Sequence, residues 1–179
     1  MFPILETERL ILREITEADT AGIFACFSNE EVTKYYGQET LKNKEEAKGF
    51  VTFFDQSYRD KRGIRWGIEL KGTKEFIGTI GFNALSLKHK RAEIGYELNQ
   101  DYWRKGYATE AITKVLEYGL NDLGLTRIGA VVFVENIASN ELLLSLGFEK
   151  EGVLKQYMYQ NRVAHDTCVY GFLKEKAYE

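Results

Sequence analysis

The chain has 179 residues, of which 44% are hydrophobic and 28% charged, and its formal net charge is −3. This length and composition fit one globular domain over residues 1–179, stable without a disulfide, and lack the strongly basic character of nucleic-acid-binding proteins. The two cysteines and two histidines form no spaced metal-binding motif, no apolar stretch is long enough to cross a membrane, and residues 1–13 lack a signal-peptide pattern. We therefore expect a cytoplasmic protein without a metal, nucleic acid or membrane partner.

The first part of the chain predicts a strand followed by helices. Residues 10–15, Leu-Ile-Leu-Arg-Glu-Ile, are typical of a strand. Thr16, with Asp19 three residues later, is typical of a helix start, and residues 30–36 indicate a short second helix. Residues 43–59 carry apolar side chains at the spacing of an amphipathic helix.

The rest of the chain predicts strands and then an alternation of strands and helices. Strands are expected at residues 64–70, 75–83, 92–98 and 127–134 and as a pair within 148–173, and helices at 106–120 and 136–146. The strand–helix–strand order over residues 92–134 implies one parallel crossover. We expect an α/β or α+β fold, with a mixed, mostly antiparallel twisted sheet of about seven strands and helices on both faces.

The most informative segment, residues 104–109, leads from a predicted strand into a predicted helix. The first turn of a helix leaves about four N–H groups without intrahelical partners, and the helix dipole attracts anions there. Gly106 and Ala108 keep the backbone accessible to a phosphate, and Arg104 and Lys105 add positive charge beside it. Neither a P-loop nor a dinucleotide fingerprint is present. The segment therefore predicts a pyrophosphate site of another kind.

Three separated motifs carry a family resemblance. They are Trp103-Arg104-Lys105-Gly106-Tyr107-Ala108, then Thr7-Glu8-Arg9-Leu10-Ile11-Leu12-Arg13 followed by Asp19, and Asn136-x-x-Ser139 followed by Leu146-Gly147-Phe148. Together the motifs resemble the GNAT superfamily of acetyl-CoA-dependent N-acetyltransferases, in particular the branch that acetylates ribosomal-protein N-termini at alanine or serine. Trp103 departs from the family pattern, which has Gln or Arg at that position. The resemblance covers nearly the whole chain and implies a GNAT-like sheet.

The resemblance implies a set of cofactor-binding residues. The pyrophosphate of acetyl-CoA would be held by backbone N–H groups of Arg104, Lys105, Gly106, Tyr107, Ala108 and Thr109. The main chain from Tyr96 to Leu98 would pair with the pantetheine arm, and the Leu98 amide would stabilise the developing oxyanion. Asn136 would contact the pantetheine, and it is also suited to cap its helix.

The candidate catalytic residues are Glu93 and Ser139. An alkylamine with a pKa of about 10 is mostly protonated at pH 7, so a base or a water relay is expected. Glu93 is the closest match to the base that family members often carry on this strand; Glu97 is the fallback, and a solvated or ion-paired role for Glu93 stays open. Alternation places Glu93, Gly95 and Glu97 on one acidic face, expected to line the acceptor cleft. Many relatives have a tyrosine proton donor where this chain has Leu143, so Ser139 is the candidate donor to the leaving sulfur, and ordinary first-turn hydrogen bonding is its alternative.

These residues predict an N-acetyltransferase that acts on a primary amine, either a protein N-terminus or a small amine, by direct attack in a ternary complex. The motifs serve the cofactor and do not specify the acceptor. Two other classes stay open: a non-catalytic CoA-binding sensor, for which the missing tyrosine leaves room, and an unrelated phosphate-ligand module. A homodimer is possible, with Tyr157, Tyr159 and the last strands forming either its contact or an acceptor pocket.

Overall fold

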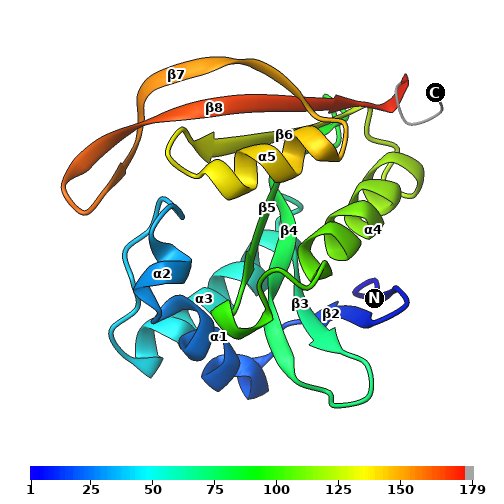
Figure 1. The fold of residues 1–179 in the computed structure, drawn as a ribbon. Coiled ribbons are helices and arrows are strands. Elements are labelled where there is room, and N and C mark those ends of the chain that lie inside the picture. The colour runs from blue at the N-terminus through cyan, green and yellow to red at the C-terminus, as the bar shows by residue number, and fades with distance from the viewer. Residues whose placement is uncertain (176–179) are drawn as a thin grey trace.

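The computed structural model describes residues 1–175 and contains one mixed sheet of eight strands in the order β1-β2-β3-β4-β5-β6-β8-β7 (Figure 1). The strands are β1 (Leu5–Glu6), β2 (Leu10–Glu14), β3 (Ile64–Leu70), β4 (Phe76–Ser86), β5 (Arg91–Leu98), β6 (Arg127–Phe133), β7 (Glu149–Gln160) and β8 (Val163–Leu173). The helices are α1 (Thr20–Phe27), α2 (Glu30–Thr33), α3 (Lys44–Arg59), α4 (Tyr107–Asn121) and α5 (Ile137–Ser145), with 3-10 turns η1 (Glu17–Asp19) and η2 (Gln100–Tyr102). Within these described residues, no helix is long and apolar enough to cross a membrane.

The mixed, mostly antiparallel sheet confirms the predicted fold class, and β5 and β6 form its one parallel pair. The expected number of strands was too small by one, because β1 was not predicted. This strand has two residues, in which Leu5 pairs with Leu12 and Glu6 pairs with Ile11. So short a run shows no detectable alternation of apolar and polar side chains.

Local capping residues set the helix boundaries close to where they were predicted. Thr16 and Asp19 form a capping box at η1. The side chain of Asn43 accepts a hydrogen bond from the Glu46 N–H at 3.0 Å and starts α3. Gly147, with a φ of +96°, follows α5 in the left-handed conformation that glycine adopts readily at helix ends.

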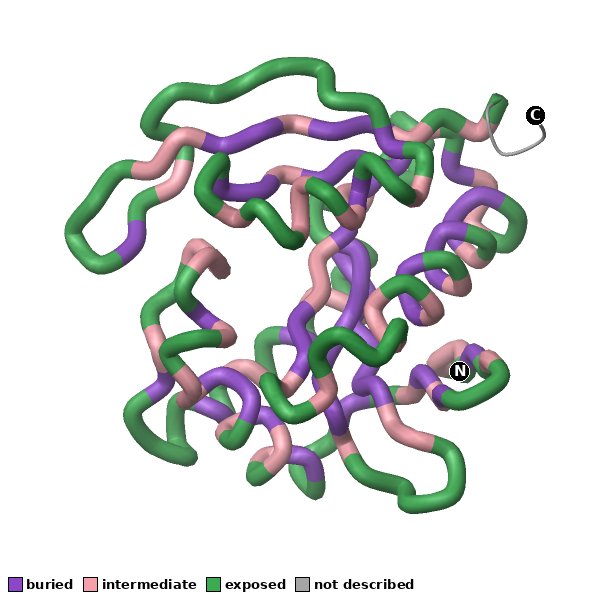
Figure 2. Tube along the Cα trace, viewed as in Figure 1, coloured by how far each residue is buried: buried purple, intermediate pink, exposed green. Residues whose placement is uncertain are grey.

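The two faces of the sheet are covered by different helices. The helices α4 and α5 lie over the face that buries Trp66, Phe82 and Ile128, and Leu143 of α5 belongs to this larger core. The helices α1 and α3 enclose a second core around Phe27 on the other face. Strand β7 at the end of the sheet is exposed along nearly its whole length (Figure 2).

Strands β5 and β6 separate shortly after they meet. They pair from Arg91 and Arg127 to Glu93 and Gly129. Beyond this point β5 continues beside β4, whereas β6 continues beside β8. In the described structure, residues 94–98 of β5 therefore have a paired strand on one edge only.

The close approach of α4 to the sheet gives a test of the fold. A Cβ atom on Gly119 of α4 would lie 2.7 Å from Phe82 Cζ and 2.9 Å from Ile128 Cδ1. We expect Gly119→Ala to lower the free energy of unfolding by about 1–3 kcal/mol, because overpacking moves neighbouring side chains. Gly49 of α3 meets nothing within 4 Å, and Gly49→Ala should stabilise by about 0.4–1 kcal/mol. Urea unfolding measures both values, and an equal effect of the two substitutions would contradict this packing.

Candidate functional site

Residues 104–109, called the phosphate loop from here on, leave the start of α4 accessible. Arg104 and Gly106 have φ angles of +60° and +82°, both in the left-handed region. Gly106 is the N-cap of α4, and no side chain caps the helix there. Arg104, Lys105, Gly106 and Thr109 are exposed, and Tyr107 and Ala108 are half-buried. The backbone donors of the first turn and the positive end of the helix dipole are thus available to an anion.

The backbone of β5 directs two N–H groups away from its paired edge. The Asn99 N–H, just after β5, donates to the Ile77 carbonyl of β4 at 2.7 Å. Because orientation alternates along an antiparallel pair, the N–H groups of Tyr96 and Leu98 point away from β4, toward the unpaired edge. On this edge the Leu98 carbonyl accepts a hydrogen bond from Trp103 Nε1 at 2.9 Å, which joins the end of β5 to the residue that precedes the phosphate loop.

Helix α5 contacts β5 through Ser139. The hydroxyl oxygens of Tyr96 and Ser139 are 2.6 Å apart. Asn136 is the N-cap of α5, where its Oδ1 accepts a hydrogen bond from the Ser139 N–H at 3.2 Å, which confirms the predicted cap. Burial raises the pKa of Tyr96 to about 12, although its hydrogen bond with Ser139 acts in the opposite direction. The phenol is therefore protonated at neutral pH.

Glu93 is the last residue of β5 that pairs with β6, where it faces Gly129. Its side chain is half-buried, and its Cγ lies 3.7 Å from the position that a Cβ on Gly129 would occupy. The pKa of the neighbouring Arg127 is raised, first by its hydrogen bond with Glu151 against the effect of burial, and to a smaller extent by the Glu93 charge. Alternation along β5 places the side chains of Glu93 and Tyr96 on opposite faces of the sheet.

The prediction that Glu97 lines the acceptor cleft, as part of an acidic face of β5, is wrong. This side chain is buried, accepts a hydrogen bond from Thr79 Oγ1 at 3.0 Å and lies 3.8 Å from Arg65 Nη1. Burial raises the pKa of Glu97, while Arg65 and Thr79 act in the opposite direction. A buried carboxylate is costly without such partners, so this end of the strand carries a compensated core pair. Of the two carboxylates, only Glu93 remains partly accessible.

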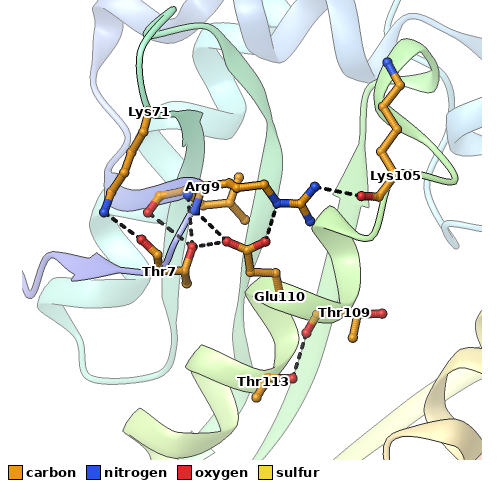
Figure 3. Close-up of polar contacts among 8 residues, drawn as sticks. Thr7, Arg9, Lys71, Lys105, Thr109, Glu110 and Thr113 are labelled. Carbon is orange, nitrogen blue, oxygen red and sulfur yellow. Dashed lines mark hydrogen bonds and ion pairs between the residues drawn. The ribbon is translucent and has the colours of Figure 1, made fainter.

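Sequence reasoning missed a group of contacts between the turn that joins β1 to β2 and the start of α4, next to the phosphate loop (Figure 3). Glu110, in the first turn of α4, accepts hydrogen bonds from Thr7 Oγ1 at 2.5 Å, from the Arg9 N–H at 2.8 Å and from Arg9 Nε at 2.7 Å. Thr7 and Arg9 were visible as part of a family motif, but Glu110 is 101 residues away from Arg9 in the chain. Periodicity and local spacing carry no signal for such a contact.

Comparison with known proteins identifies the family of this chain. The family model described as an acetyltransferase (GNAT) domain matches residues 9–149. The chain is 61% identical over 176 residues to the uncharacterized N-acetyltransferase YoaA of Bacillus subtilis, a match that covers 98% of this chain and 99% of the relative. The chain therefore belongs to the GNAT family and is an N-acetyltransferase, which excludes an unrelated phosphate-ligand module.

Solved structures share the fold at lower identity. A spermidine N-acetyltransferase from Vibrio cholerae, in complex with CoA and spermine, has a TM-score of 0.85 and 24% identity, with 97% of this chain and 100% of that chain covered. A ribosomal-protein-S5-alanine acetyltransferase from Vibrio fischeri has a TM-score of 0.82 and 21% identity, with 97% of each chain covered. Their names give a polyamine and a protein as acceptors, so the fold alone does not select the acceptor.

The hydrogen bond between Tyr96 and Ser139 can be tested by a double-mutant cycle. Tyr96→Phe and Ser139→Ala should each lower the free energy of unfolding by about 0.5–1.5 kcal/mol. The double variant should cost about as much as one single variant, since both substitutions remove the same bond. Ser145→Ala is the control, because the Ser145 hydroxyl donates to the Leu142 carbonyl of its own helix, and its effect should add to that of Tyr96→Phe independently. Fully additive effects of Tyr96→Phe and Ser139→Ala in urea unfolding would contradict the bond.

Proposed function

We propose that this N-acetyltransferase binds acetyl-CoA along the unpaired edge of β5 and transfers its acetyl group to a primary amine in a ternary complex. The observation that carries the proposal is the succession of backbone donors along the chain. The N–H groups of Tyr96 and Leu98 point to the unpaired edge, and after η2 the uncapped start of α4 follows. An extended ligand arm that ends in a diphosphate has the shape and charge to use both.

The residues present fit coenzyme A part by part. The backbone from Tyr96 to Leu98 would pair with the pantetheine arm as a further strand does, and the Asn136 side chain would contact the arm near α5. Residues 104–109 would receive the diphosphate, for which Gly106 adds no side chain and Arg104 and Lys105 add positive charge. When bound, the cofactor supplies the acetyl thioester.

The candidate catalytic side chains, Glu93 and Ser139, lie on opposite faces of the sheet and would act on different steps of the reaction. Glu93 would accept the proton of the incoming amine, directly or through a water molecule. The Leu98 N–H would donate to the thioester oxygen as it gains negative charge. Ser139, fixed by its bond to Tyr96, would donate to the leaving sulfur. Leu143, at the position of the tyrosine of many relatives, is 0% exposed and carries no hydroxyl, so Ser139, bonded to Tyr96, would take the role of that phenol.

A protein N-terminus is our first candidate for the acceptor, because the motifs of the chain resemble the ribosomal-protein branch. A polyamine is the second candidate, favoured by the likeness in fold to the spermidine enzyme. Release of the CoA thiol in the presence of N-terminal peptides and of spermidine distinguishes the two. The exposed edge strand β7, with Tyr157 and Tyr159 at 56% and 68% exposure, is the surface on which the proposed homodimer would form, and sedimentation tests it.

Thermal unfolding tests the cofactor. Acetyl-CoA at about 100 times its dissociation constant should add about 2.7 kcal/mol and raise the midpoint by about 5–10 °C, whereas ATP and NAD should not. Gly106→Ala should remove most of this shift, because its Cβ would lie 3.2 Å from Arg9 Nη2 at a φ of +82°. Gly72→Ala is the control: its φ is +89° but no atom lies within 4 Å, so the backbone strain is similar and the shift should remain. No shift in the wild type, or the same loss in both variants, would contradict the assignment.

The pH dependence of kcat/KM tests the proposed base. Glu93→Gln should lower kcat/KM by about a hundredfold or more and should change the shape of the pH profile, because the group that takes up the proton is lost. Glu45→Gln, on α3 with a side chain that is 82% exposed, is the control and should leave rate and profile unchanged. The assay measures release of the CoA thiol, with the acceptor that the comparison of N-terminal peptides and spermidine identifies. A Glu93→Gln enzyme with the wild-type profile would remove Glu93 from this role.

A further inference from the structure

The turn between β1 and β2 is held in place by contacts of its own, in addition to those that it makes with α4. The Thr7 hydroxyl, which donates to Glu110, accepts a hydrogen bond from the Leu10 N–H at 2.9 Å. The Thr7 carbonyl accepts one from Lys71 Nζ at 2.6 Å, and Lys71 also lies 3.1 Å from the Glu6 carboxylate. These two hydrogen bonds and the ion pair hold the turn in one conformation.

Arg9 connects this turn both to the phosphate loop and to Glu110, which follows the loop in the first turn of α4. Its Nε holds the Glu110 carboxylate, and its Nη1 donates to the Lys105 carbonyl at 2.9 Å (Figure 3). Its guanidinium also lies over the Tyr107 ring, with Cζ 4.4 Å from the ring centroid. One side chain thus fixes the peptide that joins Lys105 to Gly106 and the first turn of the helix that follows.

The conformation of the phosphate loop depends on these contacts with Arg9, because its own residues do not favour it. Arg104 has a φ of +60°, which is unfavourable for a residue with a Cβ atom. Gly106 is free to adopt many conformations, so its own preference does not keep the loop in this one. The direction of the first amides of α4 follows from the peptide just before Gly106, and this is the peptide whose oxygen Arg9 binds.

The same contacts compensate a charge that would oppose an anionic ligand. Glu110 lies in the first turn of α4, close to the backbone donors proposed for the diphosphate. Burial tends to raise the pKa of Glu110, but its hydrogen bonds to Thr7 and Arg9 and the Arg9 charge outweigh burial and lower it. The carboxylate is ionised at neutral pH, and Arg9 balances its charge where repulsion of a phosphate would otherwise be felt.

We infer that Thr7, Arg9 and Glu110 form a clasp that positions the phosphate loop to bind the coenzyme A diphosphate, with Arg9 and Glu110 as positioning residues. The inference rests on the proposed function, since it concerns the same cofactor. The clasp acts on the diphosphate end of the ligand and leaves the pantetheine end to β5 and α5.

The test compares CoA with pantetheine, which keeps the thiol arm but lacks both the diphosphate and the phosphoadenosine attached to it. CoA binding is measured by calorimetry, and binding of pantetheine, which has the thiol arm without the diphosphate, by NMR titration. Arg9→Gln and Glu110→Gln should each weaken CoA binding about tenfold or more, and the double variant should lose no more than the larger single loss. Arg9→Lys, which keeps the charge but not the paired donors, should recover only part of the affinity. Arg59→Gln, which breaks an exposed ion pair on α3, is the matched control and should bind CoA as the wild type does.

The two ligands separate a positioning role from a general effect on folding. Unchanged pantetheine binding in Arg9→Gln, together with weakened CoA binding, would support the clasp. Equal losses for both ligands, or wild-type affinity of Arg9→Gln for CoA, would overturn the clasp and leave the proposed function standing. A wild type that binds pantetheine but gains nothing from the diphosphate of CoA would overturn both.

Discussion

The pairing of β5 with β6 ends at Glu93 and Gly129, and the rest of the candidate site depends on this break. Backbone N–H groups in folded proteins nearly always find a hydrogen-bond partner. Where the strands separate, the N–H groups of Tyr96 and Leu98 face no neighbouring strand in the described structure, so an extended ligand or water must satisfy them. A fold that completed this pair would bury the same donors in the sheet and leave no place for the arm of a cofactor.

Contacts on both faces keep the break in place. Helix α4 returns the chain from β5 to β6 and packs its apolar face on the larger core, while α5 reaches back to β5 through Ser139 and Tyr96. On the other face the pair of Glu97 and Arg65 is buried under the first helices. At the end of β5, Trp103 holds the Leu98 carbonyl. The separated strands are thus supported by packing and by specific bonds at each side of the break.

The sequence predicted the features that depend on local spacing. Alternating or continuous apolar runs gave the long strands, apolar spacing gave α3, the capping residue Asn136 gave the start of α5, and Gly106 before an apolar helical stripe indicated the phosphate loop. Features that depend on contacts distant in sequence were not predictable. Alternation placed Glu97 on a face but did not show that Arg65 and Thr79 enclose it, and no local pattern relates Arg9 to Glu110. Strand β1 was missed because two residues have no period.

Amide hydrogen exchange at β5, with and without acetyl-CoA, tests the central claim most directly. Asn99 is an internal reference, because its N–H is already bonded to β4. The account predicts that saturating acetyl-CoA slows exchange at Tyr96, at Leu98 and in the first turn of α4, while Asn99 changes little and NAD has no effect. Exchange at Tyr96 and Leu98 that stays the same when acetyl-CoA is bound would contradict the claim that the unpaired edge of β5 holds the cofactor.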